Sequence, residues 1–150
     1  MATFDKTGQG GTTGHPANGR TPYLVENTID MSAFDPAAGD IIQAIDVPAE
    51  TLVMAAGLEV LTASSSSVTF DLGITGSTAG HQDPDAFVDA YDATGTGYAP
   101  MDATDASAML VCKVADTIDI LTAGAQDTAG KVRVWAVLCD ISGVDETDHN

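Results

Sequence analysis

Apolar and polar residues alternate along several stretches of the chain, which is the pattern of β-strands that bury one face. The clearest case is the segment 68–74, VTFDLGI, in which every second side chain is large and apolar. Runs of this kind predict strands at 40–47, 51–61, 68–74, 108–114, 117–122 and 131–141. A shorter extended piece is expected at 23–26, and a strand or a helical turn at 86–91.

Two pairs of these strands have the same arrangement of residues along the sequence. In 116–141 a strand leaves through Leu-Thr-Ala, passes a segment of small residues and is followed by a second strand, and 58–74 repeats this order. Two strand-like runs joined by a short loop with small residues are typical of a β-hairpin. We therefore expect two hairpins in an all-β domain, a β-sandwich or jelly roll of about eight strands.

The last predicted strand, 131–141, is apolar on both faces over its second half, as expected of a central strand or of one covered by a neighbouring subunit. Trp135, Val137 and Leu138 are therefore candidates for the core or for a subunit interface. Gly57 interrupts the apolar run 51–61, and an isolated glycine inside a strand suggests a bulge or a bend.

The two ends of the chain differ from the body in composition. Residues 1–20 are rich in glycine and threonine and carry little apolar surface, so they predict a flexible or extended arm. Residues 21–144 form the predicted sandwich domain, and residues 145–150 form an acidic tail.

Charge excludes several classes of partner. The chain of 150 residues has 22 acidic and 5 basic residues, a net charge of −17, and no lysine or arginine between Arg20 and Lys113. A nucleic acid or an anionic membrane would need a continuous basic surface, so neither is an expected partner. No apolar stretch approaches the roughly 18 residues of a membrane span, and the start lacks a secretory pattern, so we expect synthesis in a cytoplasm. Cys112 and Cys139 are expected as buried thiols, with a disulfide as the lesser alternative.

Catalytic and cofactor motifs are missing from the sequence. There is no Gly-x-Ser-x-Gly elbow and no phosphate loop, and of the three histidines only His81 lies in the predicted body. We expect no enzymatic activity and no cofactor. Asp83, Asp85 and Asp89 supply hard oxygen ligands that could hold a structural calcium ion, but their spacing matches no EF-hand loop, so calcium stays a secondary alternative.

Three segments carry a resemblance to a known family. VMAAGLEVLTASSSSVTFDLGITG, ADTIDILTAG and GKVRVWAVLCDI, within residues 40–141, resemble small structural proteins of tailed bacteriophages, notably marine ones, which decorate or cement the capsid. The resemblance implies a β-sandwich that forms homotrimers on the outside of the head, seated between capsomers and bound to the major capsid protein. It brings no catalytic residues.

The predicted function is therefore that of a capsid decoration protein located on the virion surface, which stabilises the expanded shell. Phe4, Lys6, Arg20 and Tyr23 are the candidate contacts with the shell, because they are the bulky or basic residues in and beside the arm. The alternative is a receptor- or glycan-binding β-domain of a phage fibre or adhesin, in which the aspartates at 83–89 would hold calcium.

Overall fold

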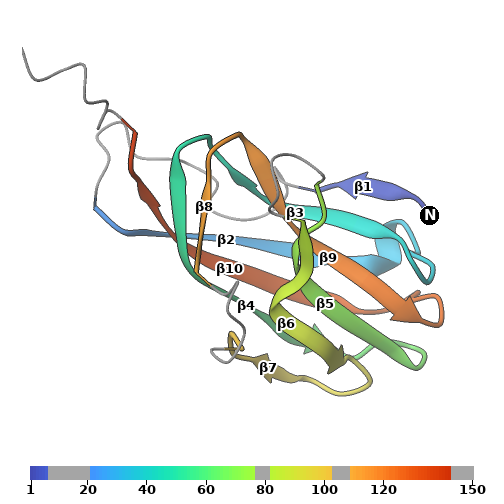
Figure 1. The fold of residues 1–150 in the computed structure, drawn as a ribbon. Coiled ribbons are helices and arrows are strands. Elements are labelled where there is room, and N and C mark those ends of the chain that lie inside the picture. The colour runs from blue at the N-terminus through green and yellow to red at the C-terminus, as the bar shows by residue number, and fades with distance from the viewer. Residues whose placement is uncertain (7–20, 77–81, 103–108, 143–150) are drawn as a thin grey trace, which may run out of the picture.

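The structure, a computed structural model, describes residues 1–6, 21–76, 82–102 and 109–142 (Figure 1). Within these ranges the chain forms ten strands and a single 3-10 turn, η1 (Met31–Ala33). The strands are β1 (Thr3–Asp5), β2 (Tyr23–Asp30), β3 (Ile41–Val47), β4 (Thr51–Thr62), β5 (Val68–Ile74), β6 (Asp83–Asp92), β7 (Gly97–Ala99), β8 (Leu110–Cys112), β9 (Asp116–Gly124) and β10 (Lys131–Asp140).

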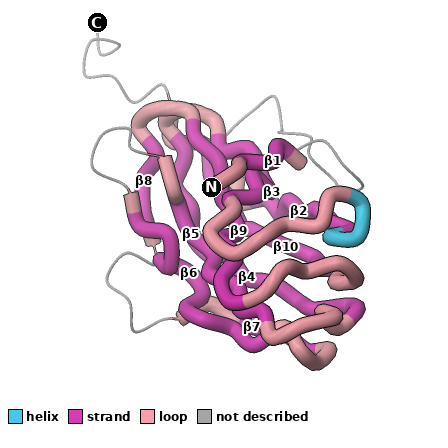
Figure 2. The backbone as a smooth tube through the Cα atoms, turned by 90° about the vertical axis from the view of Figure 1, so that its right-hand side faces the viewer, coloured by secondary structure: helices cyan, strands magenta, loops and turns pink. Residues whose placement is uncertain are grey.

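The strands form two five-stranded sheets that pack as a β-sandwich, so the all-β prediction is confirmed (Figure 2). Sheet A has the order β1-β3-β9-β5-β6, and sheet B has the order β2-β10-β4-β7, with β8 beside the first residues of β4. All pairs are antiparallel except β1 with β3.

The core lies between the sheets and is built from every second residue of the longer strands. In β10, Val132, Val134, Ala136 and Leu138 are fully buried, while the residues between them lie on the outer face. Since β10 pairs with β2 on one side and β4 on the other, the prediction of a central strand is confirmed. Burying a valine or leucine side chain contributes about 1.5–3 kcal/mol, so alternation along the central strands accounts for much of the stability.

Both predicted hairpins are wrong. β9 belongs to sheet A and β10 to sheet B, and the earlier pair, β4 and β5, is divided between the sheets in the same way. Each strand bonds to other partners: β9 lies between β3 and β5, and β10 between β2 and β4. Alternation of apolar and polar residues indicates that a strand has a buried face, but it does not indicate which neighbouring strand forms the backbone hydrogen bonds.

The two loops that cross between the sheets lie side by side. Ser65 and Thr128 share a hydrogen bond of 2.8 Å between their hydroxyl groups, and the Ala125 amide donates to the Ser67 carbonyl at 2.9 Å. The repeated segments of the sequence therefore form a matched pair of crossings at one end of the sandwich.

The predicted bulge at Gly57 is also wrong. β10 and β4 are in regular register through Trp135 and Gly57, and the register shifts at Lys131/Val132 and at Val137/Leu138 instead. A Cβ atom at position 57 would lie 2.6 Å from Cζ2 of Trp135 and 2.9 Å from the Ala99 carbonyl oxygen, so a close approach of the indole requires glycine there.

The short strand β1 joins residues from the predicted arm to the body. The carboxylate of Asp40 accepts hydrogen bonds from the amides of Ala2, at 2.6 Å, and Ala37, at 2.9 Å, and these bonds lower its pKa. From sheet B, the buried Asn27 side chain donates to the carbonyl groups of Lys6 and Ala44. Residues 7–20 lie outside the described residues, so the extent of the arm stays a prediction.

Asn27→Ala tests this link between the sheets. The substitution leaves two carbonyl groups without their donor in a buried place, so we expect it to lower the free energy of unfolding by about 1–3 kcal/mol. Urea unfolding measures the effect. Thr28→Ala, one residue along on the outer face, is the control and should change stability by less than half as much.

Candidate functional site

Three of the six exposed large apolar side chains of the described residues lie in strands of sheet B. Leu24, Leu61 and Tyr98, in β2, β4 and β7, are 56%, 37% and 60% exposed, and Met109 and Val114 flank β8. Apart from these five, Met1 is the exposed side chain of this kind, and none lies in a strand of sheet A. The two faces of the sandwich therefore differ in their apolar character.

Strand register brings six apolar side chains of this face together. Leu24 lies beside Val137, which lies beside Ala55, and two residues along β10 Trp135 lies over Gly57. Leu52 in β4 pairs with Val111 in β8. We call this set, Leu24, Leu52, Ala55, Val111, Trp135 and Val137, the apolar patch.

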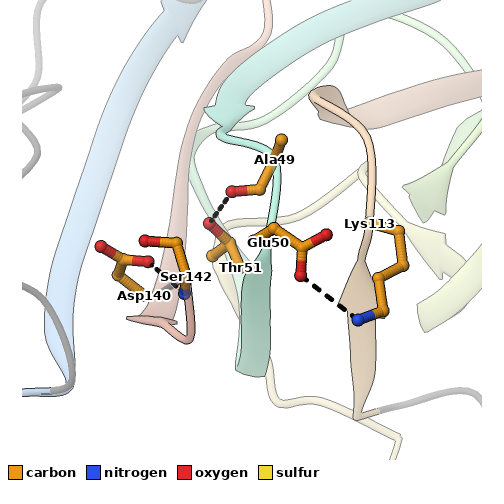
Figure 3. A network of polar contacts seen from close by, with 6 residues as sticks. All are labelled: Ala49, Glu50, Thr51, Lys113, Asp140 and Ser142. Carbon is orange, nitrogen blue, oxygen red and sulfur yellow. Dashed lines mark hydrogen bonds and ion pairs between the residues drawn. The ribbon is translucent and has the colours of Figure 1, made fainter. Parts of the chain in front are cut away.

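Three ion pairs lie at the margins of the patch. Lys131 and Arg133 of β10 pair with Asp30, at 3.1 Å, and with Glu59, whose Oε2 is 3.1 Å from Nε of Arg133. The hydrogen bonds that the Arg133 guanidinium donates to Glu59 raise its pKa. A third pair joins Lys113 to Glu50 at 3.2 Å, where β4 begins and β8 ends (Figure 3).

Sheet A has the opposite character. Its five strands contain nine aspartates and no lysine or arginine, whereas the strands of sheet B contain four acidic residues and two basic ones. Asp83 and Asp85 share a hydrogen bond, which is the main reason that the pKa of Asp85 is raised. Negative charge is thus concentrated on one side of the molecule.

Asp119 is a carboxylate that sheet A buries. It is 1% exposed, and its Oδ2 accepts hydrogen bonds from the amide and hydroxyl groups of Thr75. Its Oδ1 has no hydrogen-bond partner among the described residues. Asp119 pairs in register with Gly73, over which the chain passes at Asp83 and Pro84. Burial is the main cause that raises its pKa to about 6.

The predicted shell contacts do not form one cluster. The Phe4 ring lies 4.8 Å from the Phe34 ring, and the Lys6 ammonium lies 4.5 Å from the centre of the Phe34 ring, so these two residues meet at the edge of sheet A. Tyr23 lies at the far end of β2, opposite Leu138, and burial raises its pKa. Arg20 is outside the described residues. Whether any of the four touches a shell stays a prediction.

The remaining candidates are placed as follows. Leu138 lies in the core, while Trp135 and Val137 lie half-buried on the outer face. Cys112 and Cys139 are both free, and burial raises the pKa of Cys112 to about 11, so its thiol is unreactive at neutral pH. Asp83 and Asp85 lie half-buried on β6 and Asp89 lies exposed, and the described residues contain no group of three metal-binding side chains. His81 is outside the described residues.

Solved structures with a similar fold come from phage capsids. A chain in the capsid of Ralstonia phage GP4 is 19% identical, with a TM-score of 0.71, and the match covers 95% of this chain and 100% of that one. A chain of the acidic stable capsid structure of Helicobacter pylori bacteriophage KHP30 is 12% identical, with a TM-score of 0.58, and the match covers 81% of this chain and 90% of that one. A chain of the cyanophage Pam1 capsid is 18% identical, also with a TM-score of 0.58, and the match covers 85% of this chain and 89% of that one. At these identities the likeness establishes a shared fold.

Comparisons of the sequence, by contrast, give no match. No protein-family model matches the chain, and no curated protein matches it. No helix in the described part of the chain has the length and apolar character to cross a membrane.

Several residues of these surfaces were missed from the sequence. Leu24 was expected in a short extended piece, and Phe34 was not singled out. Asp119 occupies an ordinary polar position of an alternating strand, and only its register with Gly73 explains why it is buried. No local signal in the sequence would have identified that burial.

The buried carboxyl predicts an unusual dependence of stability on pH. Because the pKa of Asp119 is about 6 when folded and about 3.9 when unfolded, its ionisation opposes folding. The stability contribution of the neutral form is complete below about pH 4 and is lost as the pH rises through about 6. The lowered pKa values of Asp30, Asp40 and Asp92 act in the opposite direction, but only below about pH 4.

Asp119→Asn should therefore stabilise the chain at pH 7, by up to about 3 kcal/mol, and should flatten the profile between pH 4 and 6. Urea unfolding at a series of pH values measures both effects. Asp46→Asn, at an exposed position of the same sheet, is the control; an equal effect from this substitution would mean that net charge, not burial, is responsible.

Proposed function

We propose that this chain is a structural protein of a phage virion that decorates the outside of the head and stabilises the expanded shell. The observation that carries the proposal is the match in fold to a chain of the Ralstonia phage GP4 capsid, which spans that chain completely and 95% of this one. Two further phage capsids contain chains of similar fold. We expect no enzymatic activity.

The distribution of charge supports a position on the surface of a particle. A net charge of −17, with eight aspartates on the strands of sheet A besides the buried Asp119, keeps that side hydrated and opposes random association of free copies. The apolar patch lies on the other sheet, so we assign contacts with other proteins to the sheet B side of the sandwich and contact with solvent to the sheet A side.

Stabilisation follows from mass action. A protein that binds only the expanded shell lowers the free energy of that state, by about 2.7 kcal/mol per site when the free protein is at about 100 times its dissociation constant. Because a shell repeats the same site many times, modest affinity at each site is sufficient. The proposed partner is the major capsid protein, and the decoration protein itself is proposed to be a homotrimer.

Abundance in the particle tests the proposed role. A decoration protein is present in many copies, whereas a receptor- or glycan-binding domain of a fibre is present in few. Quantitative mass spectrometry of purified particles should give a copy number of the same order as that of the shell protein. A handful of copies per particle would contradict decoration and favour the fibre alternative.

Truncation tests the arm. Loading of the full chain onto expanded shells is compared with that of a chain lacking residues 1–20 and of a control lacking only residues 1–6, which removes β1 and its bonds to β3. We expect the longer deletion to weaken loading at least tenfold more than the control. Equal loading by all three proteins would refute the role of the arm. The decoration role itself is tested separately, by the copy number in the particle.

A further inference from the structure

We infer that the apolar patch on the outer face of sheet B binds a lysine or arginine side chain of another protein, with Trp135 against the cation and Glu26 as its counter-ion. The inference goes beyond the proposed function, because it specifies the chemistry of the partner surface and does not depend on whether that partner belongs to a shell. Strand β10, which carries Trp135, lies between β2 and β4, so both of these strands supply residues to the site (Figure 1).

The first reason is the position of Glu26. It lies directly opposite Trp135 in the register of β2 and β10, and both side chains are half-buried on the outer face. Directly opposed residues of an antiparallel pair have Cβ atoms about 5 Å apart on the same face. An aromatic ring attracts a cation placed over its face, and a carboxylate attracts the same cation. A single ammonium or guanidinium group can therefore contact both residues.

The second reason is that Glu26 is the carboxylate left without a cation beside Trp135. Asp30 pairs with Lys131, and Glu59 accepts hydrogen bonds from Nε and Nη2 of Arg133. Glu59 is the main cause that raises the pKa of Arg133, and the charge of Glu26 adds to it. In the described part of the chain, however, the Glu26 side chain forms no ion pair and no hydrogen bond. Its negative charge is therefore available to a partner.

The third reason is the apolar surface around these two residues. Leu24, which is 56% exposed, and Val137 form the next pair along the same face. Lysine and arginine have long aliphatic stems that pack against apolar side chains while the charged group lies at its counter-ion. A Cβ atom at Gly57 would lie 2.6 Å from the indole of Trp135, so the ring is packed against β4 before a partner binds. An aromatic side chain ordered in this way loses little conformational entropy on binding.

The fourth reason is that the charge of the chain favours a different protein as the source of the cation. A net charge of −17 attracts basic partners and repels further copies of the chain. The described basic side chains are already engaged, in ion pairs for Lys113, Lys131 and Arg133 and against the Phe34 ring for Lys6. Apart from Arg20, which is outside the described residues, a second copy could supply a cation only by breaking one of these contacts.

Peptide binding to the purified full chain tests the inference. The probe is acetyl-Leu-Arg-Leu-amide, and its control contains citrulline, which has the shape of arginine without the charge. Trp135 is the sole tryptophan of the chain, so its emission reports binding at this surface. We expect the arginine peptide to bind at least about fivefold more tightly than the citrulline peptide. Glu26→Gln should remove most of that difference, whereas Asp46→Asn, which removes one charge from an exposed position of sheet A, should preserve it.

Circular dichroism confirms that both variants fold. The inference is overturned if the wild-type chain binds the two peptides equally, or if Trp135 emission does not respond to the arginine peptide up to about 10 mM. It is also overturned if Asp46→Asn weakens binding as much as Glu26→Gln, because net charge would then be responsible. Light scattering on the same samples tests the other occupant: an oligomer whose Trp135 emission is insensitive to the peptide would mean that a second copy covers the patch.

Discussion

Strand β10 bonds to β2 on one side and to β4 on the other over most of its length, and the rest of sheet B depends on that placement. Its inner residues, from Val132 to Leu138, fill the core, and its outer residues create the ion pairs and the apolar patch. A strand has a period of two, so core and surface are specified by the same ten residues. A shift of one residue in register would exchange them, which means that the packed core also fixes the outer surface.

The same constraint explains the glycine at position 57. The indole of Trp135 can approach β4 this closely only if the residue beneath it has no side chain, and the regular register of β10 and β4 places Gly57 there. On sheet A the corresponding device is Gly73, which lets the chain pass over β5 at Asp83 and Pro84 next to the buried Asp119. Glycine within a strand has thus allowed a close approach in both sheets, once by an indole ring and once by the backbone.

The sequence was sufficient to predict the strands but not their partners. The period-two pattern located β3, β4 and β5 to within a residue, because burial of one face imposes it directly. The hairpins were wrong because a short loop can join neighbours in one sheet or cross to the other, and the loops after β4 and β9 look alike in both cases. Of the candidate site, Trp135 and Val137 were found from the doubly apolar strand, whereas Leu24 was not, since its exposure depends on β2 pairing beside β10.

Charge and apolar surface are separated between the two sheets of this fold. If the aspartates of sheet A were spread evenly, any contact between copies would bury carboxylates, each at a cost of several kcal/mol unless a cation paired with it. Instead the described lysines and arginine in and beside sheet B, Lys113, Lys131 and Arg133, each pair with a carboxylate of the same chain. The two sheets therefore divide the surface into an acidic side and a side on which the described basic residues are already paired.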